Sequence, residues 1–402
     1  MTNSSFISLF SGAGGLDIGM EQAGWHCAYA SDIDLAAVET LQRNAGRGLL
    51  HDTFVERADV TSLSAETILA KSGLRRGDVP LLVGGPPCQS WSSAGHQRGL
   101  DDPRGQLFND FIRIADALDV RWLMFENVRG LLTARGPDGS PGSALQHIRS
   151  LLLAAGFQTH VSLLNAADYG VPQRRVRLVV FGYRSGDAIA FPSPTHFKES
   201  DGKHPKWRSL RQAIAEIGPL DEDEVIRPSG KLAEQLESIP AGSGVKSPGK
   251  KETTRPGGHW GYKQGAFIAD LDLPARTVTA NAQQDWVRDP ELGLRRLCPR
   301  ECAAIQSFPS DWYFEGKRTE QYRLIGNAVP PALAKHLGAA LLAHTQVAVA
   351  KSKRKPVSLS PLAPNLMSAI RYTEKEEIRN GASRKAAPNK RQGRAKTSLL
   401  AV

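Results

Sequence analysis

Residues 80–90 read Pro80-Leu81-Leu82-Val83-Gly84-Gly85-Pro86-Pro87-Cys88-Gln89-Ser90. The apolar run at the start has the composition of a buried strand. The two prolines fix φ and favour extended geometry, so the thiol of Cys88 is held at the start of a loop. In open α/β sheets the ligand site lies at the carboxyl ends of the strands. Cys88 is therefore a candidate nucleophile, and a structural cysteine in a proline turn is the alternative.

Strand-like and helical segments alternate through the first half of the chain, which predicts a doubly wound, mostly parallel α/β sheet. The expected strands are 6–10, 26–31, 81–83, 122–125, 161–164 and 177–183. The expected helices are 16–23, 35–44, 106–118 and 144–155.

The last two strands are predicted to pair antiparallel. About a dozen residues, 165–176, join them, with Pro172 in the middle, whereas a parallel crossover needs at least that many and usually a helix. A mostly parallel sheet that ends in an antiparallel hairpin is typical of S-adenosylmethionine (SAM) methyltransferases and unusual for dehydrogenases.

The chain is expected to divide into three parts. Residues 1–185 form the main domain, completed by 324–346, in which the helical pattern of 331–345 is apolar enough to pack on it. Residues 186–323 are expected to form a smaller, loop-rich domain, since residues 186–275 contain many Pro, Gly and Ser. Residues 347–402 predict a basic, disordered tail.

Composition narrows the class of protein. Of 402 residues, 41% are hydrophobic and 23% charged, and no segment has the ~20 apolar residues that span a bilayer. The first five residues lack a signal peptide's basic region, and four cysteines suit a reducing cytoplasm. Cys298 and Cys302 have no second ligand pair nearby, so no metal site is predicted.

The net charge of +10 is confined to the carboxyl-terminal tail. Residues 351–402 hold 13 Lys and Arg against 3 Asp and Glu, so residues 1–350 are neutral overall. The tail is either a solubilising or non-functional extension or a sequence-independent phosphate anchor.

A glycine-rich turn follows the first expected strand. It reads Ser11-Gly12-Ala13-Gly14-Gly15, and Asp32 lies 20 residues after Gly12 at the end of the next strand, where an acid can accept ribose hydroxyls. The spacing is not the G-x-G-x-x-G of dinucleotide-binding proteins. A tight turn and a dinucleotide site remain the alternatives.

A nucleophilic thiolate needs an acid that faces its substrate. Carbon 6 of cytosine accepts a thiolate when N3 is protonated or strongly hydrogen-bonded. Glu126 ends another expected strand at the same sheet edge as Cys88, and burial there would raise its pKa toward the protonated form. A solvated residue or a helix cap is the alternative for Glu126.

Two arginines share one face of the strand that begins near residue 176. The alternation in Gln173-Arg174-Arg175-Val176-Arg177 puts Arg175 and Arg177 on that face, where they could bind a phosphate or a base oxygen. The alternative is that these arginines lie on an edge strand, where their charges discourage aggregation. The loop between Gln89 and Arg104 is predicted to be a lid over the thiol.

These motifs, in this order, resemble those of the C5-cytosine DNA methyltransferases over residues 6–183 and 276–345. Phe10 to Gly15 resembles the SAM loop, Gly85 to Gln89 the nucleophile motif, and Glu126-Asn127-Val128 the proton-donor motif. The remaining matches are Gln173 to Arg177, Arg276-Thr277-Val278-Thr279 and Gly326-Asn327-Ala328-Val329-Pro330-Pro331.

The resemblance implies roles for individual residues. Phe10 would stack on the adenine of SAM, Asp32 would hold the ribose, and Asp59 the adenine amino group. The other implied cofactor residues are Gly12, Gly14, Gly15, Leu16, Ile33, Pro86, Leu107, Asn327 and Val329. The implied catalytic residues are Cys88, Glu126, Arg175 and Arg177.

The implied reaction is transfer of a methyl group from SAM to C5 of a cytosine flipped out of double-stranded DNA, through a covalent bond from Cys88 to C6. The smaller domain would recognise the target. Trp91 stands where the family commonly has Phe, and Asp32 where it often has Glu. A cytoplasmic, nucleoid-associated bacterial monomer is expected, in or outside a restriction-modification system with a separate endonuclease.

Three other interpretations stay open at this point. A tRNA cytosine-5 methyltransferase would use the same chemistry, but the ~90-residue segment before Arg276 suits duplex reading better. A catalytically silent DNA-binding paralogue is disfavoured by the intact Cys88, Glu126 and Arg175. A nicotinamide-dependent dehydrogenase is disfavoured by the glycine spacing and the final hairpin.

Overall fold

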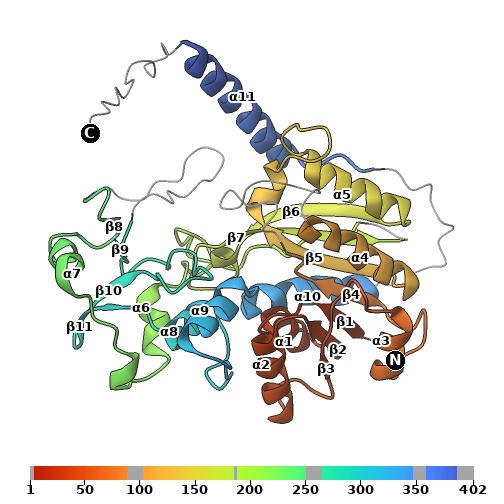
Figure 1. The fold of residues 1–402 in the computed structure, drawn as a ribbon, viewed down its shortest axis with the longest axis horizontal. Coiled ribbons are helices and arrows are strands. Elements are labelled where there is room, and N and C mark those ends of the chain that lie inside the picture. The colour runs from red at the N-terminus through yellow and green to blue at the C-terminus, as the bar shows by residue number, and fades with distance from the viewer. Residues whose placement is uncertain (1–3, 88–102, 185–187, 250–264, 347–358, 387–402) are drawn as a thin grey trace, which may run out of the picture.

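The computed structural model describes residues 4–87, 103–184, 188–249, 265–346 and 359–386. Its main sheet has seven strands in the order β3-β2-β1-β4-β5-β7-β6 (Figure 1). All neighbours pair parallel except β5 with β7 and β7 with β6. The strands are β1 (Ser5–Leu9), β2 (His26–Asp32), β3 (Phe54–Arg57), β4 (Leu81–Gly84), β5 (Trp122–Val128), β6 (Gln158–Asn165) and β7 (Val176–Tyr183).

The predicted fold class, including the antiparallel final hairpin, is confirmed. The chain winds outward from β1 to β3 and then returns to β4 on the other side of β1. This makes the gap between the carboxyl ends of β1 and β4 the topological switch point, where doubly wound sheets bind ligands.

Successive side chains of the strands point to opposite faces of the sheet, and each face has its own apolar core. Phe6 lies in the core beneath α1, α2 and α10, whereas its neighbour Ile7 lies in the core beneath α3, α4 and α5. The helices and short 3-10 segments of this domain are α1 (Gly15–Gln22), α2 (Leu35–Gly46), α3 (Ala65–Ser72), α4 (Pro103–Ala117), η2 (Arg129–Thr133), α5 (Ser143–Ala154), η3 (Ala166–Tyr169) and α10 (Pro331–Gln346).

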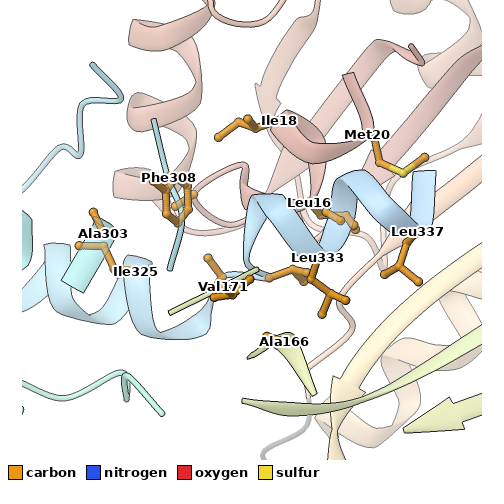
Figure 2. Close-up of a cluster of buried hydrophobic side chains, with 14 of the residues drawn as sticks. Leu16, Ile18, Met20, Ala166, Val171, Ala303, Phe308, Ile325, Leu333 and Leu337 are labelled. Atoms are coloured by element: carbon orange, nitrogen blue, oxygen red, sulfur yellow. The ribbon is translucent and has the colours of Figure 1, made fainter. Parts of the chain in front are cut away.

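Helix α10 returns the chain to the main domain, as the sequence predicted. Figure 2 shows Leu16 and Met20 of α1 beside Leu333 and Leu337 of α10. The helices approach closely, because a methyl group added at Gly19 would lie 2.3 Å from the carbonyl oxygen of Pro331. The packing of α1 in the main domain therefore depends on α10, a helix from a much later part of the sequence.

The smaller domain is loop-rich, with a second sheet in the order β11-β10-β9-β8. Its core includes Ile268 and Trp286, and the buried Arg295 joins its last hairpin to the following helix by bonding both oxygens of Glu301 at 2.8 Å. The elements are α6 (Leu210–Ala215), η4 (Glu222–Glu224), α7 (Gly230–Glu237), β8 (Ser243–Gly244), β9 (Phe267–Ile268), β10 (Trp286–Asp289), β11 (Gly293–Arg296), α8 (Pro299–Ile305) and α9 (Arg318–Asn327).

Part of the segment expected to be a disordered tail is ordered. Residues 364–386 form α11 (Pro364–Ala386), which extends away from the body at the top of Figure 1. Its first turns are anchored, since Leu366 and Ile370 are buried in the core that holds α5. Arg149 of α5, itself buried, donates to the carbonyl of Ser360 just before this helix. The prediction missed this segment because its apolar residues are few and its charge is high.

No helix in the described part of the chain is long and apolar enough to span a membrane.

Candidate active site

The glycine loop between β1 and α1 lies at the switch point of the sheet. Gly12 has φ +56, and a side chain at that position would meet no atom within 4 Å, so the loop faces open space. The backbone N–H of Gly12 donates to Oδ2 of Asp32 at 2.8 Å, and that of Asp34 donates to Oδ1 at 2.9 Å. The two oxygens of Asp32 thus hold the loop and the end of β2 at a fixed separation.

An apolar side chain and an acid stand together at the end of β2. Ile33 is 58% exposed, which is unusual for isoleucine, and it follows the half-buried Asp32 directly. Burial raises the pKa of Asp32, and the N–H groups of Asp34 and Gly12 oppose that shift. An exposed apolar surface beside a hydrogen-bond acceptor fits a nucleoside, which has an apolar ring and ribose hydroxyls.

The loop before α10 closes the glycine loop from the opposite side. A methyl group at Gly15 would lie 2.2 Å from the carbonyl oxygen of Val329, so only glycine permits this approach. The Val329 side chain is buried, whereas Asn327 is exposed. The predicted cofactor residues from the two ends of the chain are therefore brought together.

The remaining cofactor candidates occupy different surroundings. Phe10 has a left-handed φ of +57, a strained conformation for a non-glycine residue, and packs with Leu107 against the same core. Asp59 is exposed and accepts two hydrogen bonds from Thr61, which lower its pKa. The Leu16 side chain is buried against α10, so only its backbone could contact a ligand.

The ends of β4 and β5 are joined beside the nucleophile motif. Nδ2 of Asn127 donates to the carbonyl of the buried Pro86 at 3.0 Å. A methyl group at Gly85 would lie 3.9 Å from Oε2 of Glu126. The proline turn and the proton-donor candidate are thus neighbours. Cys88, Trp91 and most of the predicted lid lie outside the described residues.

Glu126 is buried and paired with one of the two predicted arginines. It is 8% exposed, and Nε of Arg177 lies 2.8 Å from its Oε1. Glu126 stands opposite Val179 in the antiparallel register, so alternation puts Arg177 on the same face. Burial raises the pKa of Glu126, and the charges of Arg177 and Arg175 moderate the rise. Glu126 therefore takes up a proton more readily than a carboxyl group exposed to solvent.

Arg175, the second arginine predicted to bind a phosphate or a base oxygen, is buried in the structure. It is 1% exposed, and its guanidinium donates to the carbonyls of Val278, Gly326 and Ala328 at 3.0, 2.8 and 2.9 Å. Val278 belongs to the Arg276-Thr277-Val278-Thr279 motif within the smaller domain, whereas Gly326 and Ala328 belong to the motif that follows this domain. Substrate binding by Arg175 stays a prediction, and in the structure its terminal nitrogens hold these chain segments together.

Sequence reasoning missed three structural contributors. Asn127 was quoted in a motif without a role, yet it holds the proline turn. Gln173 donates to Oε1 of Gln306 at 2.8 Å and accepts from the N–H of Val278 at 2.9 Å. Arg323 of α9 pairs with Asp34 beyond β2. Nothing in the local sequence signals such long-range partners.

No group of His, Cys, Asp or Glu side chains suited to a metal ion occurs among the residues that the structure describes.

Comparison with known proteins identifies the family. The family model of C-5 cytosine-specific DNA methylases matches residues 4–343. Type II methyltransferase M1.HphI of Haemophilus parahaemolyticus is 32% identical over 84% of this chain and 86% of its own length. Type II methyltransferase M.NgoFVII of Neisseria gonorrhoeae is 33% identical over 81% and 83%.

Solved structures agree on the fold. That of Schizosaccharomyces pombe Dnmt2 methyltransferase has a TM-score of 0.58 at 17% identity, covering 85% of this chain and 99% of that one. The chain belongs to the C-5 cytosine-specific DNA methylase family, whose members have the SAM-dependent methyltransferase fold.

Proposed function

We propose that this protein methylates C5 of a cytosine extruded from double-stranded DNA, with SAM as methyl donor and Cys88 as covalent nucleophile. The observation that carries this proposal is the buried Glu126, paired with Arg177 and adjacent to the turn that leads into Cys88. Family membership supplies the substrate class.

The residues present suit SAM. The open glycine loop, Asp32 and Ile33 offer backbone, acceptor and apolar contacts for a nucleoside, and Asn327 is exposed at the closing loop. When bound, the donor supplies a methyl group on a sulfonium. Phe10, Leu107 and Asp59 are proposed to contact its adenosine.

The reaction follows from the chemistry of the side chains. The Cys88 thiolate forms a bond to C6 while Glu126 protonates or hydrogen-bonds N3, which makes C5 nucleophilic. C5 would then take the methyl group as its bond to the donor's sulfur breaks, leaving S-adenosylhomocysteine as a neutral thioether. Loss of the C5 proton and cleavage of the bond from sulfur to C6 restore the aromatic ring and the thiolate. Arg177 orients Glu126 and moderates its pKa.

The substrate is proposed to be duplex DNA, bound between the main domain and the target recognition domain, residues 186–323. The enzyme is proposed to act as a cytoplasmic bacterial monomer. We also propose that a restriction endonuclease acts separately on the same DNA, because relatives of this chain are named Type II methyltransferases.

The experiment measures transfer of radiolabelled methyl groups to duplex DNA and, separately, to tRNA. We expect incorporation into DNA only, as C5-methylcytosine. Cys88→Ser and Glu126→Gln should abolish turnover but retain SAM binding, because neither residue is placed in the cofactor pocket. Glu39→Gln, an exposed change on α2, is the matched control and should keep full activity. Methylation of tRNA alone, or normal turnover by Cys88→Ser, would overturn the proposal.

A further inference from the structure

Asp17 is a fully buried carboxyl group directly beneath the glycine loop. It is the third residue of α1 and has 0% exposure, and within the described ranges no donor has full hydrogen-bond geometry to either carboxyl oxygen, although the Ser8 hydroxyl is near enough to act on its charge. An ionised carboxylate without partners is costly to bury. Packing alone therefore does not explain why a carboxyl group is buried at position 17.

A short hydroxyl relay runs from the loop to this carboxyl group. The hydroxyl of Ser11 in the loop donates to Oγ of Ser8 at 2.8 Å. The Ser8 hydroxyl therefore remains able to donate its own proton to another acceptor, such as the Asp17 carboxylate. Ser8 is fully buried on β1 and favours the ionised form of Asp17. Ionisation of Asp17 would thus give Ser8 an acceptor and fix Ser11.

The other groups that act on Asp17 oppose its charge. Glu21 on the same helix and Asp32 at the end of β2 both disfavour ionisation, and the thiol of Cys27 on β2 is itself affected by Asp17. Burial is the largest effect, and together they raise the pKa of Asp17 to about 7. At neutral pH, a nearby positive charge is therefore enough to change its protonation.

The methyl donor and its demethylated product differ by one positive charge. The methyl donor carries a sulfonium and a net charge of +1, whereas the demethylated product has a neutral thioether. Asp32, the proposed ribose ligand, is close enough to Asp17 for their charges to interact. A cation bound beside Asp32 would compensate the charges of both carboxylates.

We infer that Asp17 is a positioning residue that loses its proton when the cationic methyl donor binds, and that it thereby makes the site prefer the donor over the neutral product. The inference rests on the proposed SAM site. The proton passes from the Asp17 carboxyl to the solvent, and Ser8 donates its hydrogen bond to the carboxylate that remains.

The test is calorimetric binding of SAM and of S-adenosylhomocysteine between pH 5.5 and 8.5, in buffers with different heats of ionisation. We expect proton release on binding of SAM and a Kd that falls as pH rises to about 7 and then levels. If binding lowers the Asp17 pKa by one unit, the change in Kd is about tenfold. The product should show a much smaller change.

Variants separate a charge effect from a structural one. Asp17→Asn should make the ratio of the two Kd values independent of pH. Ser8→Ala keeps the carboxyl group but removes its donor, so the pH dependence should move to higher pH. Asp138→Asn, an exposed change on the loop before α5, should behave as wild type.

The possible results are distinct. A wild-type pH profile in both Asp17→Asn and Ser8→Ala would overturn the inference, and the Ser8→Ala profile decides alone if Asp17→Asn does not fold. SAM binding without pH dependence in the wild type would also overturn it while leaving the proposed function intact. Failure of the wild type to bind SAM at any pH would instead refute the proposed function.

Discussion

Arg175→Met tests whether this arginine stabilises the structure or binds substrate. The methionine fills much of the same volume but removes hydrogen bonds to three buried carbonyls. The Ala328 carbonyl keeps a second donor, Nε2 of Gln306 at 3.2 Å, so the main loss falls on Val278 and Gly326. At roughly 2 kcal/mol for each charged hydrogen bond, the free energy of unfolding should fall by about 4 kcal/mol.

The assay is urea unfolding followed by tryptophan fluorescence, with SAM binding measured in parallel. Arg211→Met is the matched control, because Arg211 is an exposed arginine paired with the exposed Asp272, and it should leave the free energy of unfolding nearly unchanged. An Arg175→Met protein that unfolds at the wild-type midpoint but cannot methylate DNA would refute this reasoning. It would restore substrate binding as the role of Arg175.

Three further predictions concern packing and pH. Leu366→Ala should lower the free energy of unfolding by about 3 kcal/mol, whereas Leu273→Ala, at an exposed leucine, should change it little; equal urea midpoints would mean that α11 is not docked. Gly326→Ala should destabilise the chain and abolish activity, because its methyl group would lie 2.2 Å from the Thr279 carbonyl; an active variant with a wild-type melting temperature would contradict this close approach. Asp17→Asn should gain stability relative to wild type as pH rises from about 4 to 7, because the folded-state pKa is about 7 and the unfolded one 3.8, with an upper limit of about 4 kcal/mol; parallel stability curves for the two proteins would count against a buried, titrating carboxyl group.

The sheet could be predicted from sequence because its strands are strongly apolar and regularly spaced. The antiparallel hairpin followed from one loop length, and alternation put Arg177 on the face of Glu126. Within the predicted main domain, β3 and α3 were missed: β3 is a short edge strand with two exposed and two half-buried residues, and α3 buries only Ala65 and Ile68. Such elements carry little periodic signal.

The surroundings of the site residues could be predicted less well. Periodicity gave the direction of Arg175 but not its burial, since its partners lie more than 100 residues away in the chain. Asp17 attracted no attention because a charged residue in a first helical turn is ordinary. Its burial depends on α1 being covered by α10, which is a tertiary effect.

Covalent trapping tests the proposed chemistry most directly. A DNA duplex with 5-fluorocytosine at the target position is incubated with the protein and SAM, and the products are separated under denaturing conditions. The fluorine cannot leave as a cation, so the bond between sulfur and C6 should persist, giving a DNA–peptide adduct at Cys88 that Cys88→Ser does not form. Methyl transfer to ordinary DNA with no adduct, or an adduct at another residue, would contradict the assignment of Cys88.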